Sequence, residues 1–182
     1  MSQGLVKGLD HDRIPAISCK RRDVLRLSLK EYKDHADLVT AGFEMDAKFL
    51  HGQTVFSGRD LPCRTQLVPL AAIFAALGEE GEKGGVRDRI ARWYWCGVFG
   101  ELYGSGIETR FAKDFPQVVD WVSGGPEPDS IRDANFVPGR LLSVRTRNSA
   151  VYNGLISLLM RDGCRNLRTG EAIDVQVYFY ED

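Results

Sequence analysis

Leu67-Val68-Pro69-Leu70-Ala71-Ala72-Ile73-Phe74-Ala75-Ala76-Leu77 is the longest apolar run of the chain. Apolar residues surround this segment almost completely, which is the pattern of a helix packed on several sides. Thr65 can cap the helix, and Pro69 falls close enough to its start to cost little hydrogen bonding. The run therefore predicts a central helix over about 65–78, which is too short to span a bilayer.

A long amphipathic helix is predicted upstream of this run. Ser28 and Glu31 have the spacing of a capping box, in which hydroxyl and carboxylate satisfy free N–H groups at a helix start. Apolar residues then recur at steps of three or four, which places them on one face of a helix over 29–51. The members of this apolar face are Tyr32, Ala36, Val39, Phe43, Ala47 and Leu50.

An aromatic helix is predicted downstream of the run. Residues 78–85 are rich in glycine and charge, which indicates a flexible, solvated connection. The next segment, 86–103, contains Trp93, Tyr94 and Trp95 and predicts a buried helix, because aromatic residues at helical spacing beside glycines are usually core. Stacking of these rings on nucleic-acid bases is the less favoured alternative. Cys96 lies in the same apolar stretch, where a thiol tends to be inert.

The segment 107–122 predicts further helix, with a turn that restarts at Pro116. Arg110 and Asp114 stand four positions apart in it, which favours an ion pair on the helix surface. The alternative is an inward-turned side chain that fixes packing. In either case we expect no catalytic carboxylate here.

The C-terminal part changes from helix to strand. Residues 149–162 predict a helix that Asn148 or Ser149 caps and Gly163 ends. The Thr169-Gly170 pair and the later alternation of apolar residues predict a β-hairpin. The alternating apolar residues are Val175, Val177 and Phe179.

These elements define the fold class. The stretch 123–139 is rich in glycine and proline and is the best candidate for a boundary between subdomains. We predict a mainly α fold, with a multi-helix bundle at 1–122, a linker at 123–139, and a helix plus a short C-terminal β-hairpin at 140–182.

Composition excludes several classes of protein. The chain has 182 residues, with 24 Lys and Arg against 25 Asp and Glu, so it is neither a uniformly basic nucleic-acid binder nor an acidic disordered tail. The N-terminus has no apolar signal region, so we expect a cytoplasmic protein without a membrane partner. The cysteines lack the spacing of a zinc site or a disulfide framework, and reduced thiols are the simplest interpretation. They are Cys19, Cys63, Cys96 and Cys164.

No set of residues predicts catalysis or a bound cofactor. The histidines are His11, His35 and His51, which are too scattered to form a compact metal site. The pair Gly104 and Gly106 lacks a preceding strand and a third glycine, so it does not complete a dinucleotide motif. We therefore predict no catalytic residue and no metal ligand.

One basic patch stands above the background. The segment 139–170 contains six arginines, no lysine and one acid, Asp162. The planar fork of arginine suits bidentate phosphate contact, so the patch is a candidate DNA-binding site. The alternative is that these arginines pair with carboxylates of the helical half. The six are Arg140, Arg145, Arg147, Arg161, Arg165 and Arg168.

Five segments, in this order along the chain, carry a family resemblance. They resemble the central and C-terminal region of GmrSD-like proteins, which are prokaryotic modification-dependent restriction endonucleases. In that family an NTPase-like domain precedes a helical region, and an HNH-type nuclease with a His-His-Ile-Phe-Pro-like metal motif follows it. The segments are RIPAISCKRRD (13–23), LPCRTQLVPL (61–70), RWYWC (92–96), ETRFAKD (108–114) and RTRNSA (145–150).

The resemblance implies a scaffold without catalytic activity of its own. The nuclease motif and the NTPase motifs are absent from this sequence, so we expect an excised fragment in which 140–182 leads into a truncated HNH-type domain. Divalent metal and nucleotide are implied only for the missing parts of the parent. The expected partners are DNA and the other domains of the parent chain. The alternative is a helical protein-interaction module without nucleic-acid binding, for which a homo-oligomer is possible.

Overall fold

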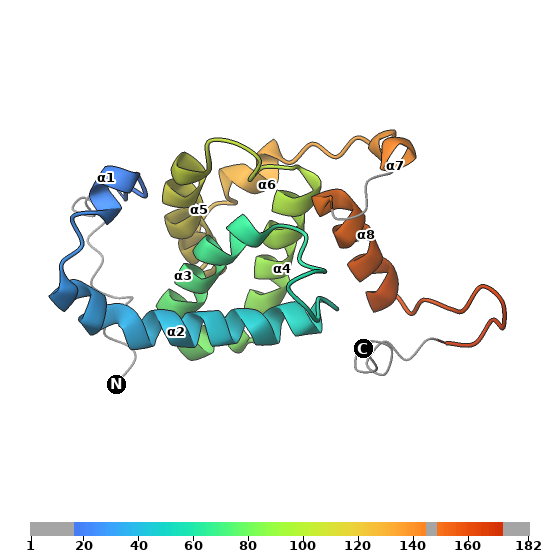
Figure 1. Cartoon of the computed structure of the whole chain (residues 1–182), viewed down its shortest axis with the longest axis horizontal. Coiled ribbons are helices and arrows are strands. Elements are labelled where there is room, and N and C mark those ends of the chain that lie inside the picture. Colours follow the sequence, from blue (N-terminus) through green and yellow to red (C-terminus); the bar gives the residue numbers. More distant parts are fainter. Residues whose placement is uncertain (1–16, 145–148, 173–182) are drawn as a thin grey trace.

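The computed structural model describes residues 17–144 and 149–172 (Figure 1). Helices dominate these residues, as the sequence predicts. Two 3-10 turns, η1 and η2, flank the central helix. The elements are α1 Arg21–Val24, α2 Leu29–Gly52, η1 Arg64–Gln66, α3 Leu67–Leu77, η2 Gly78–Glu82, α4 Gly84–Phe99, α5 Ile107–Val122, α6 Asp129–Asp133, α7 Arg140–Ser143 and α8 Ala150–Arg161.

The apolar run forms the centre of the bundle. Helix α3 packs against α2 and α5, and its Leu70 and Ile73 are fully buried. The aromatic residues of α4 complete the core: Trp93 and Tyr94 are fully buried, and Phe49 of α2 contacts Tyr94 edge to face. The prediction that these rings are core rather than base-stacking surfaces is therefore confirmed.

Helix α2 begins as predicted but buries a different face. The capping box is present, with Ser28 N–H donating to Glu31 Oε2 at 2.8 Å. The buried residues are Gly42, Asp46, Phe49 and Leu50. Most of the predicted apolar face is instead exposed, because the N-terminal half of α2 extends past α3 and α5 (Figure 1). Its exposed members include Tyr32 (60%), Val39 (45%) and Phe43 (44%).

The crossing of α2 and α3 explains which face turns inward. A Cβ added at Gly42 would lie 2.4 Å from the carbonyl oxygen of Ala71, so the two backbones meet where α2 carries no side chain. The helix therefore turns the glycine toward α3, and Asp46, one turn further on, is buried with it.

The glycine-rich connection after α3 contacts the core at Gly81. It forms η2, and Gly81 is buried because its backbone lies over the ring of Phe74. A Cβ at Gly81 would come within 2.8 Å of that ring. The other residues of 78–85 are exposed, so the prediction of a solvated connection is confirmed, although 78–82 forms a 3-10 turn and Gly84 begins α4.

Helix α5 runs through Pro116 without a restart. The predicted ion pair between Arg110 and Asp114 is wrong. Asp114 is buried and accepts a hydrogen bond from the Tyr103 hydroxyl, whereas Arg110 pairs with Asp133 at 3.0 Å. The inward-turned alternative therefore describes Asp114 correctly.

The stretch 123–139 contains the short helix α6. Ser130 and Ile131 of this helix are buried, and α6 packs against α4 and α5. The Arg92 guanidinium of α4 also pairs with Glu127 at 2.8 Å. The division of the chain at 123–139 stays a prediction.

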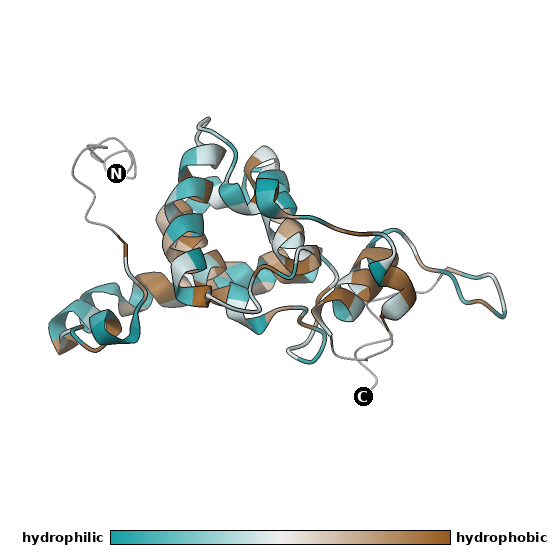
Figure 2. Ribbon diagram, turned by 90° about the horizontal axis from the view of Figure 1, so that it is seen from above, coloured by the Kyte–Doolittle hydropathy of each residue, from teal (hydrophilic) through white to brown (hydrophobic). Residues whose placement is uncertain are grey.

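Helix α8 begins and ends as predicted. Ser149 caps it, accepting a hydrogen bond from Tyr152 N–H at 3.2 Å, and Gly163 follows its end with φ of +83°. Figure 2 shows the hydrophobic residues along α8 and the hydrophilic loop that leaves it. None of the described helices is both long enough and apolar enough to cross a bilayer.

The predicted C-terminal hairpin is not supported by the described residues. They form a single antiparallel bridge, between Arg165 and Ala172, and no strand. The turn is closed by Asn166, whose side-chain oxygen accepts from Arg168 N–H and whose backbone N–H donates to Glu171 O. Every residue of 165–172 is exposed, so no buried face extends the ladder. The alternating residues 175–179 lie outside the described residues.

Candidate functional site

Side-chain hydrogen bonds hold α8 on the rest of the bundle. The Thr54 hydroxyl donates to the Ser157 carbonyl at 2.5 Å, and the Asn153 amide donates to the Arg59 carbonyl at 3.2 Å. On the other side, Gly154 lets Val98 of α4 approach, since a Cβ there would lie 3.0 Å from a Val98 methyl group. Helix α8 is therefore fixed to α4 and to the loop after α2.

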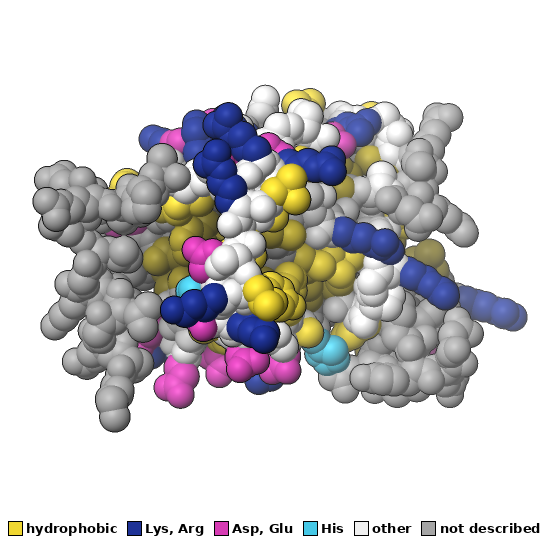
Figure 3. All heavy atoms as spheres, turned by 60° about the vertical axis from the view of Figure 1, so that its left-hand side comes forward, with side chains coloured by type: hydrophobic (Ala, Val, Ile, Leu, Met, Phe, Trp, Pro, Cys, Tyr) yellow, Lys and Arg dark blue, Asp and Glu magenta, His cyan; other side chains and the backbone are white. Residues whose placement is uncertain are grey.

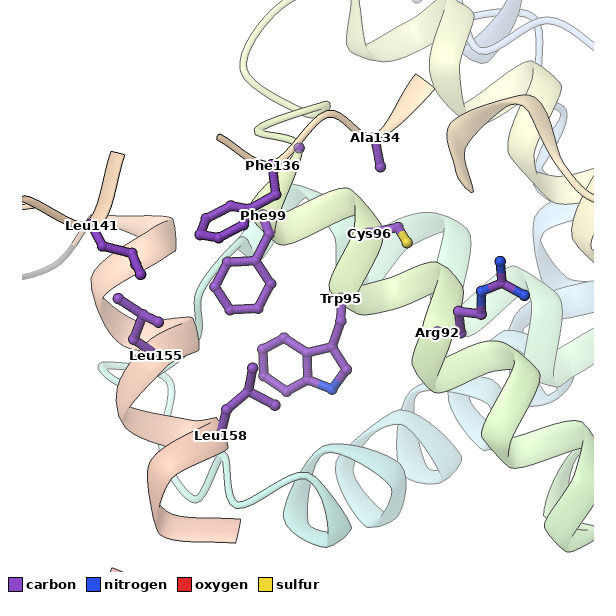
Figure 4. A pocket seen from close by; sticks show the side chains of 10 residues that line it. Arg92, Trp95, Cys96, Phe99, Ala134, Phe136, Leu141, Leu155 and Leu158 are labelled. Carbon is purple, nitrogen blue, oxygen red and sulfur yellow. The ribbon is translucent and has the colours of Figure 1, made fainter. Parts of the chain in front are cut away.

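An apolar groove of about 450 Å³ lies between α4, α8 and the segment 134–141. Figure 4 shows Trp95 and Phe99 of α4 facing Leu155 and Leu158 of α8 across this groove. The ring centroids of Trp95 and Phe99 are 5.8 Å apart and stacked. These contacts make the groove a packing seam of the helical bundle.

The polar residues at the groove offer no reactive group. The Arg92 guanidinium points away from the facing apolar side chains in Figure 4, and it pairs with Glu127 and lies over the Trp121 ring. Burial raises the pKa of the Cys96 thiol, so this cysteine stays protonated at neutral pH. The thiol at the groove is therefore a weak nucleophile at neutral pH.

Three of the predicted DNA-binding arginines follow one another at the end of α8. Arg161 donates to the Gln53 side chain at 3.2 Å, and Arg165 donates to the Gly170 carbonyl at 3.0 Å. Arg168 is exposed, and its guanidinium has no partner among the described residues. All three arginines are exposed. Figure 3 shows Lys and Arg side chains, in dark blue, at several places on one face of the molecule.

Arg140 lies apart from these three, on α7. Its guanidinium donates to both carboxylate oxygens of Glu101, at 3.2 and 3.3 Å. Arg140 thus pairs with a carboxylate of the helical half, which is the alternative that the sequence left open for the basic patch. The remaining two patch members, Arg145 and Arg147, lie outside the described residues.

Two acids are buried among the described residues: Asp114, for which the sequence left an inward-turned side chain as the alternative, and Asp46, which sequence patterns did not place inside. Asp114 accepts from the Tyr103 hydroxyl, and burial raises the pKa of Asp114 despite that bond. Asp46 is 2% exposed, and neither of its carboxyl oxygens has a hydrogen-bond partner among the described residues. Burial raises the pKa of Asp46 to about 8. The sequence contains one signal for this group: Asp46 stands three residues after Phe43 and four before Leu50, which is the spacing of one face of a helix.

The described histidines serve local contacts. His35 Nδ1 lies 2.9 Å from the Glu31 carbonyl oxygen, and the ring of His51 packs against Phe56. Over 17–144 and 149–172, no group of three or more His, Cys, Asp or Glu residues lies close enough to hold a metal ion. His11 is outside the described residues.

Comparison with known proteins finds a distant similarity. An uncharacterised protein of the archaeon Methanocaldococcus jannaschii is 26% identical over 80 residues, which cover 41% of this chain and 14% of that protein. The chain thus matches a small part of a much longer relative. No family model and no solved structure matches the chain.

Proposed function

We propose that this chain is a helical scaffold from a GmrSD-like, modification-dependent restriction endonuclease, that it is catalytically inactive, and that it contacts DNA phosphate through the arginines at and after the end of α8. The observation that carries the DNA contact is the surface position of Arg161, Arg165 and Arg168, none closely paired with a carboxylate. The nearest acid, Asp162, lies 3.9 Å from Arg161.

The anchoring of α8 supports the scaffold part of the proposal. Hydrogen bonds from Thr54 and Asn153, together with the apolar groove, hold α8 against the bundle. The arginine-bearing loop that follows stands out from the rest of the molecule (Figures 1 and 2). A rigid support of this kind can set the position of cationic side chains relative to a duplex and to other domains of a longer chain.

A salt series on duplex DNA tests the phosphate contact. Each phosphate contact that is lost lowers the slope of log affinity against log salt by about 0.9. We expect Arg165→Ala together with Arg168→Ala to reduce that slope by about 2 and to weaken binding in low salt. Fluorescence anisotropy with labelled duplex measures both quantities.

The matched control removes two arginine charges at another place on the surface. Arg22 and Arg26 have side chains that are 74% and 80% exposed near α1, and alanine at both positions should leave the slope unchanged. Equal slopes for all three proteins, or no binding in low salt, would contradict phosphate contact by the loop. Arg145→Ala with Arg147→Ala extends the series to the rest of the patch.

The second candidate is a protein-interaction module, which the exposed face of α2 favours. Leu29 (69%), Tyr32 (60%) and Val39 (45%) lie on this face, and exposed apolar stripes of this kind commonly mark interfaces. Concentration-dependent dimerisation in sedimentation experiments, abolished by Tyr32→Lys with Val39→Lys, would support this function. Binding to DNA with a normal salt slope in the same variant would favour the first.

A further inference from the structure

Asp46 is a buried acid without a hydrogen-bond donor. It is 2% exposed, and both carboxyl oxygens lack a partner among the described residues. The Tyr94 hydroxyl of α4 is its electrostatic neighbour and also has no partner there. Buried polar groups are normally hydrogen-bonded, because an unsatisfied one costs on the order of 1–3 kcal/mol. An unpartnered carboxyl at a cavity therefore indicates a missing donor.

A pocket of about 350 Å³ adjoins Asp46. The exposed side chain of Phe43 lies one turn before Asp46 on α2, and Phe56 of the following loop forms another wall. The remaining lining is largely aliphatic, with His51 at the side, and it contains no Lys or Arg among the described residues. The pocket thus has aromatic walls and no internal cation, and Asp46 belongs to its lining with both acceptor oxygens covered in this structure.

We propose that this pocket binds an amidinium or guanidinium group, whose paired N–H groups donate to Oδ1 and Oδ2 of Asp46. Two oxygens of one carboxylate match the spacing of two N–H donors on such a planar cation, and charge assistance strengthens both bonds. Aromatic faces also attract a desolvated cation. The volume suits a molecule of one ring or an arginine side chain.

Entry requires a small movement of the wall. Each carboxyl oxygen exposes less than 1 Å² in this structure. The ring of Phe43, which is 44% exposed, has room to move, and binding requires the wall to open until the carboxyl oxygens reach the pocket. This site uses none of the six arginines and is independent of the DNA-binding proposal.

Calorimetry with benzamidine tests the proposal. At about pH 8.5, above the pKa of Asp46, the carboxylate form is available to the cation. We expect benzamidine to bind and benzamide, its neutral counterpart of the same shape, to bind at least about tenfold more weakly. Equal binding of the two would overturn the proposal, because it would leave a merely apolar pocket.

Two variants distinguish the loss of the carboxylate from a loss of folding. Asp46→Asn keeps the shape of the side chain. Circular dichroism and thermal melting should show that this variant is folded, and calorimetry should show that it no longer binds benzamidine. Asp37→Asn removes an exposed acid of the same helix and should bind as the native chain does. Unchanged binding by folded Asp46→Asn would also overturn the proposal, as would no binding of benzamidine to the native chain.

A second ligand distinguishes the source of the cation. The peptide Gly-Arg-Gly presents the guanidinium as a protein side chain, whereas benzamidine presents an amidinium on a small ring. Tighter binding of the peptide would assign the pocket to an arginine of a partner protein, and tighter binding of benzamidine to a small cation. Either result supports the proposed chemistry when Asp46→Asn abolishes it.

Discussion

At the scale of the residue, Asp46 couples the stability of the fold to pH. The pKa of this carboxyl is about 8 in the folded chain, against an ordinary value of 3.8. Between these two values the folded chain keeps a proton that the unfolded chain releases. Stability therefore falls as pH rises from about 4 to about 8 and levels off above that range.

Asp46→Asn should remove this pH dependence. The amide carries no charge, so the variant does not lose stability as Asp46 does. The free energy of unfolding of Asp46→Asn, relative to that of the native chain, should therefore rise between pH 5 and pH 7 by at most about 1.4 kcal/mol per pH unit. Urea unfolding of both proteins at these two pH values measures it. A constant difference between them would show that Asp46 ionises freely in the folded chain.

The buried pair of Tyr103 and Asp114 supports the core between α4 and α5. The hydroxyl of Tyr103 donates to Asp114 Oδ2, and both residues are buried. Tyr103→Phe removes the donor and leaves the carboxyl short of a partner, which should destabilise the fold by about 1–3 kcal/mol. Chemical denaturation measures the loss. Tyr32→Phe, at a 60% exposed position, is the control and should change nothing.

At the scale of the element, the crossing of α2 and α3 depends on Gly42. A Cβ at this position would lie 2.4 Å from the Ala71 carbonyl oxygen, which belongs to backbone and cannot turn aside. Gly42→Ala should therefore separate the helices and destabilise the fold by about 1–3 kcal/mol, although alanine favours helix. Thermal melting measures the change.

Gly84 provides the matched comparison for Gly42. It lies in the first turn of α4, and a Cβ there would meet nothing within 4 Å. Gly84→Ala should leave stability unchanged or raise it slightly, because it reduces the freedom of the unfolded chain. Equal effects at Gly42 and Gly84 would contradict the close crossing of α2 and α3.

At the scale of the whole molecule, the groove joins α8 to the bundle. Leu158 packs against the core, whereas its neighbour Leu159 is 59% exposed. Leu158→Ala should reduce amide hydrogen-exchange protection in α8 more than in α3, since α8 depends on this seam and α3 does not. Leu159→Ala should leave both helices unaffected. Equal effects of the two alanine variants would contradict a scaffold that holds α8 rigidly.

The sequence determined which segments form the main helices and where α2 and α8 begin and end, whereas α4 ends at Phe99, four residues before the predicted 103. The Ser28 and Glu31 pair marks the start of α2, Ser149 and Gly163 bound α8, and the apolar run marks α3. These signals are local, because capping groups and apolar spacing act within a few residues. The mainly helical class and the aromatic core followed from them.

Tertiary structure alone decided which faces are buried and which charged groups are paired. The backbone crossing at Gly42 turned Asp46 inward and left Tyr32 and Val39 exposed, although apolar spacing favours the opposite. Asp114 likewise accepts a hydrogen bond from Tyr103 and does not pair with Arg110. Such partners come from segments distant in the chain, so local patterns cannot specify them. The pocket at Asp46 exists only where α2, α3 and the loop between them meet.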